Sequence, residues 1–270
     1  MRRTVLITGA SQGFGKLIAK KFHKEGWNVI ATMRTPEKET ELTELDNVLV
    51  NRLDVTDKDS ITKSVAEGVE RFGKIDVLVN NAGFGLQGPY MSSSEEMVSK
   101  QMNVNVFGVL NVTRAVLPYM EKNKDGVIVN FSSIAGLVGL PHTAVYNATK
   151  YAVEGFTEGL QYELNPIGIK LKLVQPGAFN TGFVSSMDRP DVSDNCIYKA
   201  GWDATVAQID SMIGEGQDPQ EVADITFLAA TDGEETLRYI VGGDAIQIME
   251  ARKQMNDVEF KSMLMEAFNL

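Results

Sequence analysis

The amino-acid sequence predicts one α/β domain, built on a mostly parallel, doubly wound sheet of seven strands with helices on both faces. Short apolar runs alternate with segments of helical periodicity along the chain, which is typical of this class. The runs are almost continuously apolar, as expected for strands that are buried on both faces. Loops are short and no linker, repeat or low-complexity tract divides residues 1–270, so we expect a single domain.

The first strand is expected at Thr4–Thr8, a β-branched, apolar run that ends at a glycine-rich turn, Gly9–Gly15. A helix is expected from Lys16 to Gly26, because its apolar residues recur at helical spacing. A second strand follows at Asn28–Met33. A strand–helix–strand unit of about 30 residues with a glycine-rich first turn is typical of a Rossmann-type, dinucleotide-binding domain.

The later elements continue this alternation. Further strands are expected at 48–50 with Leu53, and at 77–79, 127–131, 170–175 and 238–241. Helices are expected at 59–72, 95–120 and 218–231, and over a segment that starts after Ser133 and ends near Leu164. Asn103, Asn105 and Gly108 are unusual residues for the middle of a long helix.

Two C-terminal stretches differ from this pattern. At about 182–216 no periodicity is visible, and we expect a substrate loop or lid, because long irregular insertions in compact domains are usually functional. At about 249–270 apolar residues recur at helical spacing, so we expect a helical tail that packs against the body.

The composition excludes several classes of protein. A net charge of −10 argues against nucleic acid or an anionic membrane surface as the main partner. The single Cys196 fits a reducing compartment, and one cysteine with two histidines argues against a metal cluster. No apolar run approaches the roughly 20 residues of a membrane span, and the apolar start is too short for a signal peptide. We therefore expect a cytoplasmic protein.

The glycine-rich turn indicates a phosphate site. Gly9, Gly13 and Gly15 are spaced Gly-x-x-x-Gly-x-Gly, which lets the backbone turn sharply and approach a pyrophosphate at the N-terminus of the next helix. A tight turn without a ligand is the alternative, and the flanking strand–helix–strand pattern favours phosphate. Asp54, Asn81–Gly83, Ser133 and Pro176-Gly177 also follow predicted strands, which places them with this turn at the carboxyl edge of the sheet, where ligands bind.

Tyr146 and Lys150 are four residues apart, so on a helix they lie on one face about one turn apart. An ammonium beside a phenol favours the phenolate and is expected to lower the tyrosine pKa from its usual value of about 10. Such a pair arises easily by chance, and it becomes informative only together with the strand-end residues.

Together these residues resemble the classical short-chain dehydrogenase/reductase family. The resemblance covers residues 4 to about 181, with a further fit near 238–244, and rests on Thr8–Gly15, Asp54-Val55, Asn80–Gly83, Asn105, Ser133, Tyr146-x-x-x-Lys150, Pro176-Gly177 and Thr181. It implies that Tyr146 is the catalytic acid/base and that Ser133, 13 positions earlier, polarises the substrate carbonyl. It further implies that Lys150 binds the nicotinamide ribose, and that Asn105 holds a water linking Lys150 to solvent.

These implied roles agree with the chemistry of hydride transfer. The transfer creates or consumes an alkoxide, so a proton donor must lie within hydrogen-bond reach of that oxygen. A second hydroxyl stabilises the developing oxyanion, and the cofactor carries the hydride itself. The full set of expected cofactor contacts is Gly9, Ser11, Gln12, Gly13, Phe14, Gly15, Arg34, Asp54, Val55, Asn81, Ala82, Gly83, Tyr146, Lys150, Pro176, Gly177, Phe179 and Thr181.

The expected cofactor is NADP(H), with NAD(H) possible. An NAD site usually has an acidic residue at the end of the second strand, whereas Ala31–Thr35 has no acid and contains Arg34, which would pair with a 2′-phosphate. NADP-preferring members of the family often have a basic residue in the glycine motif, where this chain has Gln12. Asp54 is expected to accept a hydrogen bond from the adenine amino group, and a local capping role is its alternative.

The expected substrate is a mainly hydrophobic carbonyl or secondary alcohol, because the candidate pocket walls are apolar or aromatic. These walls are Phe84, Leu86, Tyr90, Ile134, Leu137, Val138, Phe183, Met187 and Trp202, and Arg189 is a cation in the same lid. The alternatives are a non-catalytic, NADP(H)-binding redox sensor and an epimerase or dehydratase that retains its nicotinamide. A homodimer or homotetramer is implied by the family, and Phe156 and Leu160 are interface candidates. His23 and His142 are expected to be ordinary surface or helix-start residues.

Overall fold

The computed structural model describes residues 2–183, 186–214 and 217–270. Their strands form one sheet in the order β3-β2-β1-β4-β5-β6-β7, and every pairing is parallel. The strands are β1 Thr4–Thr8, β2 Asn28–Met33, β3 Val48–Arg52, β4 Val77–Asn80, β5 Gly126–Phe131, β6 Ile169–Pro176 and β7 Arg238–Val241. The strand order reverses between β1 and β4, and ligands bind beyond the strand ends at such a switch point. The predicted fold class is confirmed.

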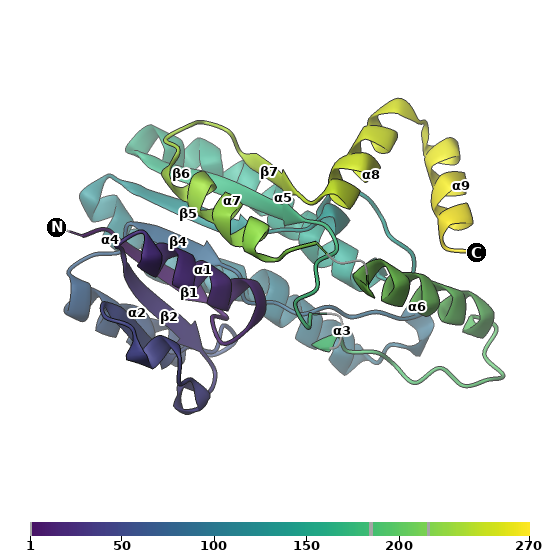
Figure 1. Cartoon of the computed structure of the whole chain (residues 1–270), viewed down its shortest axis with the longest axis horizontal. Coiled ribbons are helices and arrows are strands. Elements are labelled where there is room, and N and C mark those ends of the chain that lie inside the picture. The colour runs from purple at the N-terminus through teal and green to yellow at the C-terminus, as the bar shows by residue number, and fades with distance from the viewer. Residues whose placement is uncertain (1, 184–185, 215–216) are drawn as a thin grey trace.

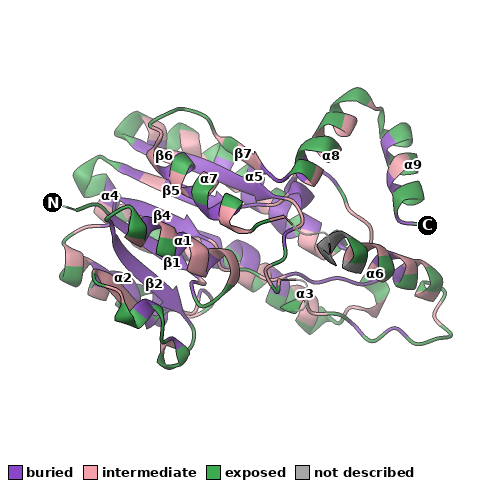
Figure 2. Ribbon diagram, viewed as in Figure 1, coloured by how far each residue is buried: buried purple, intermediate pink, exposed green. Residues whose placement is uncertain are grey.

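Helices cover both faces of the sheet, whose strands are buried between them (Figures 1 and 2). The helices are α1 Gly13–Lys24, α2 Lys58–Phe72, α3 Glu95–Met102, α4 Gly108–Asn123, α5 Ala144–Leu164, α6 Lys199–Gly214, α7 Gln220–Thr231, α8 Gly243–Gln254 and α9 Asp257–Ala267. Val5 packs in one apolar cluster with Phe22 of α1, and its neighbour Leu6 packs in another with Val116 of α4. This alternation along a strand produces two core layers from one continuously apolar run.

The long helix predicted at 95–120 is interrupted. A π-helical turn, Asn103–Phe107, separates α3 from α4, and its Asn105 is 2% exposed. Such π turns within helices are frequent at functional sites, because they redirect a side chain. Gly108 follows the turn at a close approach, where a Cβ would lie 2.7 Å from Val55 Cγ2. The unusual residues therefore mark a local change of helix geometry.

The second half of the irregular stretch is helical, since residues 199–214 form α6. The C-terminal tail is two helices rather than one, α8 and α9, and it begins at Gly243 instead of near 249. Figure 1 shows α8 and α9 as a hairpin beside α6. Asn256 starts α9 with a capping box. Phe260, Leu264 and Phe268 of the tail pack with Ile134 and Val138, so the tail borders the segment that follows Ser133.

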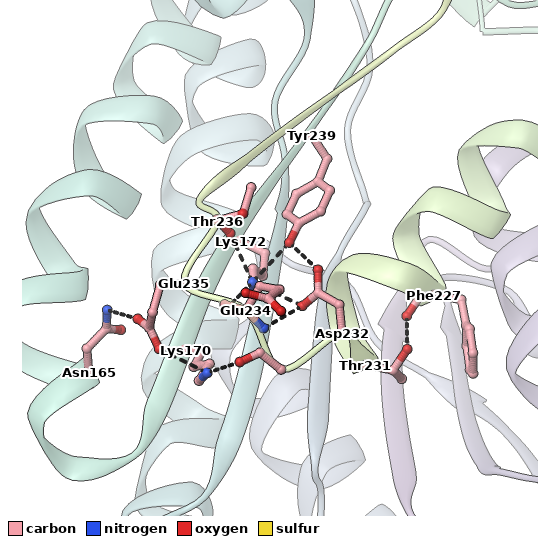
Figure 3. Close-up of polar contacts among 11 residues, drawn as sticks. Asn165, Lys170, Lys172, Phe227, Thr231, Asp232, Glu234, Glu235, Thr236 and Tyr239 are labelled. Carbon is pink, nitrogen blue, oxygen red and sulfur yellow. Dashed lines mark hydrogen bonds and ion pairs between the residues drawn. The ribbon is translucent and has the colours of Figure 1, made fainter.

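A buried lysine holds the connection between α7 and β7 (Figure 3). Lys172 of β6 is 1% exposed, and its ammonium donates to Glu234 O at 2.7 Å, Thr236 O at 2.9 Å and Tyr239 Oη at 3.0 Å. Asp232 lies 3.4 Å from this ammonium and compensates its charge. The cluster is at the amino end of β7, away from the strand ends that form the candidate site.

None of the helices in the described ranges is long and apolar enough to cross a membrane. Phe156 and Leu160, the predicted interface residues, are half-buried and pack against the chain's own apolar clusters. Two other aromatic residues are more exposed: Phe107, just before α4, is 52% exposed, and Tyr151 of α5 is 48% exposed. An interface role for Phe156 and Leu160 stays a prediction.

Candidate active site

The glycine-rich turn between β1 and α1 forms an open cradle. Gly9 and Gly13 have φ of 69° and 54°, which favours glycine. A Cβ on Gly15 would lie 2.2 Å from Gly9 O, so a side chain there would close the turn. Gln12, at the N-cap of α1, makes no side-chain cap, and the first turn contains no acid. The N–H groups of this helix start are thus suited to an anionic phosphate.

The turn after β4 is tied to this cradle. The Asn81 amide nitrogen donates to Thr8 O at 2.9 Å and to Gly9 O at 3.1 Å. Thr8 Oγ1 in turn accepts from Asn81 N and Ala82 N at 3.1 and 3.0 Å. Asn81 and Ala82 therefore lie beside the glycine-rich turn, as the sequence predicted, and Asn81 links the ends of β1 and β4. Gly83 faces Asn105, because a Cβ on it would lie 3.2 Å from Asn105 Oδ1.

The ends of β2 and β3 carry the residues predicted to bind the adenosine part. Arg34 is exposed directly after β2, with no acid in residues 31–35. Asp54 Oδ1 accepts from Thr56 N at 2.9 Å and from Thr56 Oγ1 at 2.7 Å, which closes a local turn. The N-cap of α2 is Asp57 and not Asp54. Val55 is 8% exposed. The adenine contact predicted for Asp54 stays a prediction.

Ser133, Tyr146 and Lys150 come together where β5 ends and α5 begins. Ser133 interacts with the Tyr146 hydroxyl through its side chain, and its Oγ accepts from Ala135 N at 3.1 Å. Lys150 Nζ lies 5.6 Å from the centre of the Tyr146 ring. It donates to Phe131 O at 2.8 Å, so the last residue of β5 holds the ammonium one turn from the phenol.

Burial is the largest influence on the pKa values of Tyr146 and Lys150, and it changes the expected direction for Tyr146. Burial raises the pKa of Tyr146 to about 12, and the hydrogen bond with Ser133 opposes that rise. Burial also lowers the pKa of Lys150 to about 8, and the negative charge of Glu154 opposes that fall. The expected lowering of the Tyr146 pKa by Lys150 is therefore wrong for the chain alone, because burial takes the phenolate out of water and raises the pKa.

Asn105 joins three segments of the site. Its Nδ2 donates to Phe84 O at 2.9 Å, and its Oδ1 accepts from Phe84 N at 3.1 Å. The same Nδ2 lies 3.3 Å from Thr149 Oγ1, which donates to Tyr146 O at 2.7 Å. The amide thus fixes the π turn, the segment after β4 and the first turns of α5 relative to one another. The water relay to Lys150 stays a prediction.

The turn after β6 lies against the glycine-rich turn. The Phe179 ring packs edge-on against Phe14, with 5.7 Å between ring centres. A Cβ on Gly13 would lie 3.4 Å from Thr181 O. Phe179 and Thr181 therefore border the glycine-rich turn, whereas Pro176 O lies 3.5 Å from Ser133 Oγ and Gly177 lies against Asp244. Two residues that the sequence did not indicate, Gln217 and Asp244, bind the backbone of this turn.

The predicted substrate walls are brought together only in part. Leu86, Ile134, Val138 and Trp202 are buried, and the Phe183 ring lies 6.0 Å from that of Tyr146. A Cβ on Gly85 would meet the Met187 side chain at 2.8 Å. Phe84 and Leu137 are half-buried, whereas Tyr90 is 62% exposed, so a wall role for Tyr90 is not supported.

Arg189 of the lid and His142, which precedes α5, have defined contacts. Arg189 Nε donates to Gln87 Oε1 at 3.1 Å, and its guanidinium lies 5.9 Å from the Trp202 ring centre. His142, expected to be an ordinary residue, links α6 to the start of α5, because its Nδ1 lies 2.7 Å from Thr205 Oγ1. Its ring also packs edge-on against Trp202. No sequence motif indicates these contacts, which join segments about 60 residues apart.

Comparison with known proteins gives matches along the chain. The family model described as short chain dehydrogenase matches residues 3–191. The 3-ketodihydrosphingosine reductase of Bacteroides thetaiotaomicron is 46% identical over 182 residues, which are 67% of this chain and 66% of that protein.

Solved structures match the chain over more than nine-tenths of its length. A short-chain dehydrogenase from Streptomyces avermitilis superposes with a TM-score of 0.86 at 32% identity, over 98% of this chain and 96% of the other. ElxO, solved with NADP bound, gives a TM-score of 0.76 at 30% identity, over 92% of this chain and all of the other.

Proposed function

The chain belongs to the short-chain dehydrogenase family, and we propose that it is an NADP(H)-dependent oxidoreductase that interconverts a carbonyl and a secondary alcohol on a mainly hydrophobic small molecule. The observation that carries this proposal is the grouping of Ser133, Tyr146 and Lys150 at the carboxyl edge of the sheet. A proton donor, a second hydroxyl and a cation in one place match the needs of hydride transfer at a carbonyl.

The choice of NADP(H) rests on the two ends of the nucleotide. The turn at Gly9, Gly13 and Gly15 is so tight that a Cβ on Gly15 would meet Gly9 O at 2.2 Å, and it leads into the N-terminus of α1, which suits a pyrophosphate. Exposed Arg34 at the end of β2, with no acid beside it, suits a 2′-phosphate. ElxO, solved with NADP bound, supports the same choice. When bound, the nicotinamide supplies or accepts the hydride.

The residues of the chain would divide the remaining work. Tyr146 protonates the carbonyl oxygen during reduction, or takes the proton from the alcohol during oxidation. With a pKa of about 12, Tyr146 is protonated at neutral pH, which is the form required for reduction. Ser133 donates to the same oxygen and stabilises its developing charge. Lys150 binds the nicotinamide ribose hydroxyls, and Asn105 fixes the start of α5 through Thr149.

The substrate class rests on the apolar ring next to Tyr146. The Phe183 ring lies 6.0 Å from that of Tyr146, which favours an apolar body next to the reacting carbonyl. The Bacteroides relative is named as a reductase of 3-ketodihydrosphingosine, which supports testing that ketone first within a panel of carbonyls and alcohols.

Tyr146→Phe tests the mechanism. We expect it to lower NADPH-dependent carbonyl reduction by about 10²- to 10⁴-fold, the range for loss of a general acid. NADPH affinity, measured by fluorescence titration, should stay within about twofold, because the phenol donates its proton to the substrate. Tyr151→Phe, on the same helix and 48% exposed, is the matched control and should retain activity. Full turnover by Tyr146→Phe would contradict the mechanism.

A further inference from the structure

The turn that follows β6 is held by two side chains from far along the chain. Asp244 Oδ2 accepts from Ala178 N at 2.7 Å, and Asp244 Oδ1 accepts from Gln217 Nε2 at 2.8 Å. Gln217 Nε2 also donates to Ala178 O at 3.3 Å, and its Oε1 accepts from Gly243 N at 2.6 Å. The backbone N–H and C=O of Ala178 are thus both hydrogen-bonded by the Asp244–Gln217 pair.

Two glycines, Gly177 and Gly242, make space for the Asp244 carboxylate. A Cβ on Gly177 would lie 2.2 Å from Asp244 Oδ1, and a Cβ on Gly242 would lie 2.8 Å from the same atom. Gly242 also has a φ of 105°, which favours glycine. Asp244 lies in the first turn of α8, where the helix dipole stabilises a carboxylate. The glycine after Pro176 is therefore explained by the carboxylate that occupies its side-chain space.

The bound turn faces the glycine-rich turn directly. Phe179, next to Ala178, packs edge-on against Phe14, and its backbone pairs with that of Gln217. Thr181 O lies beside Gly13. Because these contacts are close, a shift of Ala178 would move the surface that borders the glycine-rich cradle.

We propose that Asp244 and Gln217 are positioning residues for the Gly177–Thr181 turn and set its fit to the nicotinamide cofactor. The inference rests on the proposed NADP(H)-binding function, since the turn borders the cradle assigned to that cofactor. It adds two residues that lie 66 and 39 positions from Ala178 and to which the family resemblance assigns no role.

Asp244→Asn tests the proposal with little change of shape. If the amide nitrogen of the new asparagine faces Gln217 Nε2, two N–H donors oppose each other. If the amide is rotated by 180°, its nitrogen faces Ala178 N, which is also a donor. Turning Gln217 instead loses its bonds to Gly243 N and Ala178 O. No orientation satisfies the cluster, so we expect the NADPH dissociation constant to rise about tenfold or more, as for loss of a bond to a charged group.

The double variant Asp244→Asn with Gln217→Glu distinguishes positioning from general damage. The introduced amide is then able to donate to the introduced carboxylate and still accept from Ala178 N, while that carboxylate accepts from Gly243 N. The 3.3 Å bond from Gln217 to Ala178 O is lost, and a carboxylate oxygen then faces that carbonyl oxygen, which makes this the one mismatch left in the cluster. We expect the double variant to recover NADPH affinity to within about threefold of the wild type, and Gln217→Glu alone, with two adjacent carboxylates, to bind weakly.

The measurements are NADPH fluorescence titration and thermal unfolding of each cofactor-free variant. Asp224→Asn is the control. Asp224 lies on the exposed face of α7, where it accepts from Gln220 Nε2 at 3.3 Å and pairs with Lys21, near the far end of α1, at 3.2 Å. Exposed ion pairs contribute little, so this variant should bind NADPH as the wild type does. If Asp244→Asn fails to fold, the double variant decides the question by itself.

The outcomes separate this inference from the proposed function. Wild-type affinity in Asp244→Asn, or a folded double variant that binds at least about tenfold more weakly, would overturn the positioning role alone. A wild-type protein that binds no NADPH would overturn the proposed function and this inference with it. Loss in the single variant with recovery in the double supports the inference.

Discussion

The buried ammonium of Lys150 is expected to reduce the stability of the cofactor-free protein. Burial lowers its pKa from 10.5 to about 8, and a lowering of this size corresponds to about 3 kcal/mol. The folded-state pKa lies below the unfolded one, so this cost is fully present below pH 8. It is relieved as the pH rises from 8 towards 10.5, where the folded protein has already lost the proton.

Lys150→Met removes the charge and keeps an unbranched apolar stem. The variant leaves Phe131 O without the donor that lay 2.8 Å away, at a cost of about 1 kcal/mol. Glu154 stays compensated, since it accepts from Gln175 Nε2 and Arg238 Nε at 2.7 and 2.9 Å. We therefore expect Lys150→Met to unfold with a free energy about 2 kcal/mol above that of the wild type near pH 7.

Urea unfolding of the cofactor-free proteins measures this difference. The gain should shrink when the pH is raised to about 9.5, because the wild type then loses the burial penalty. Lys122→Met, at an exposed position of α4, is the control and should change stability little at either pH. A Lys150→Met variant that is less stable near pH 7, or a difference that does not depend on pH, would refute the reasoning.

Two further predictions concern other charged residues. Arg34→Asp should weaken NADPH binding by about tenfold or more and shift the preference towards NADH, by removing a charge-assisted contact to the 2′-phosphate; an unchanged ratio of kcat/KM for the two cofactors would show that Arg34 does not read this phosphate. Lys172→Met should lower the free energy of unfolding by about 3–5 kcal/mol, because it strips the donor from the cluster in Figure 3 and leaves half-buried Asp232 without its cation. Lys170→Met, whose partner Glu235 is exposed, should cost about 1 kcal/mol or less.

The strands and helices that were predicted correctly have clear local patterns of apolar residues. Strands such as Thr4–Thr8 are continuously apolar, and helices such as Lys58–Phe72 have a single apolar stripe. These signals depend on neighbours within a few residues. The prediction missed α6, although its buried Trp202 and Thr205 and the packed Ile209 recur at helical spacing. It also missed the π turn, although Asn103, Asn105 and Gly108 stood out as unusual residues for a helix interior.

The sequence by itself determined the glycine-rich turn and the Tyr146–Lys150 pair, because sharp turns and one-turn helical spacings are set by adjacent residues. The tertiary structure decided the burial of these residues, their pKa values and the hydrogen bonds that support the neighbouring turn. Burial raises the pKa of Tyr146 against the expected direction, and Asp244 reaches Ala178 from 66 residues away. Desolvation and long-range hydrogen bonds arise only when distant segments pack together, so the ionisation of the acid/base residue and the support of its neighbouring turn could not be read from local spacing.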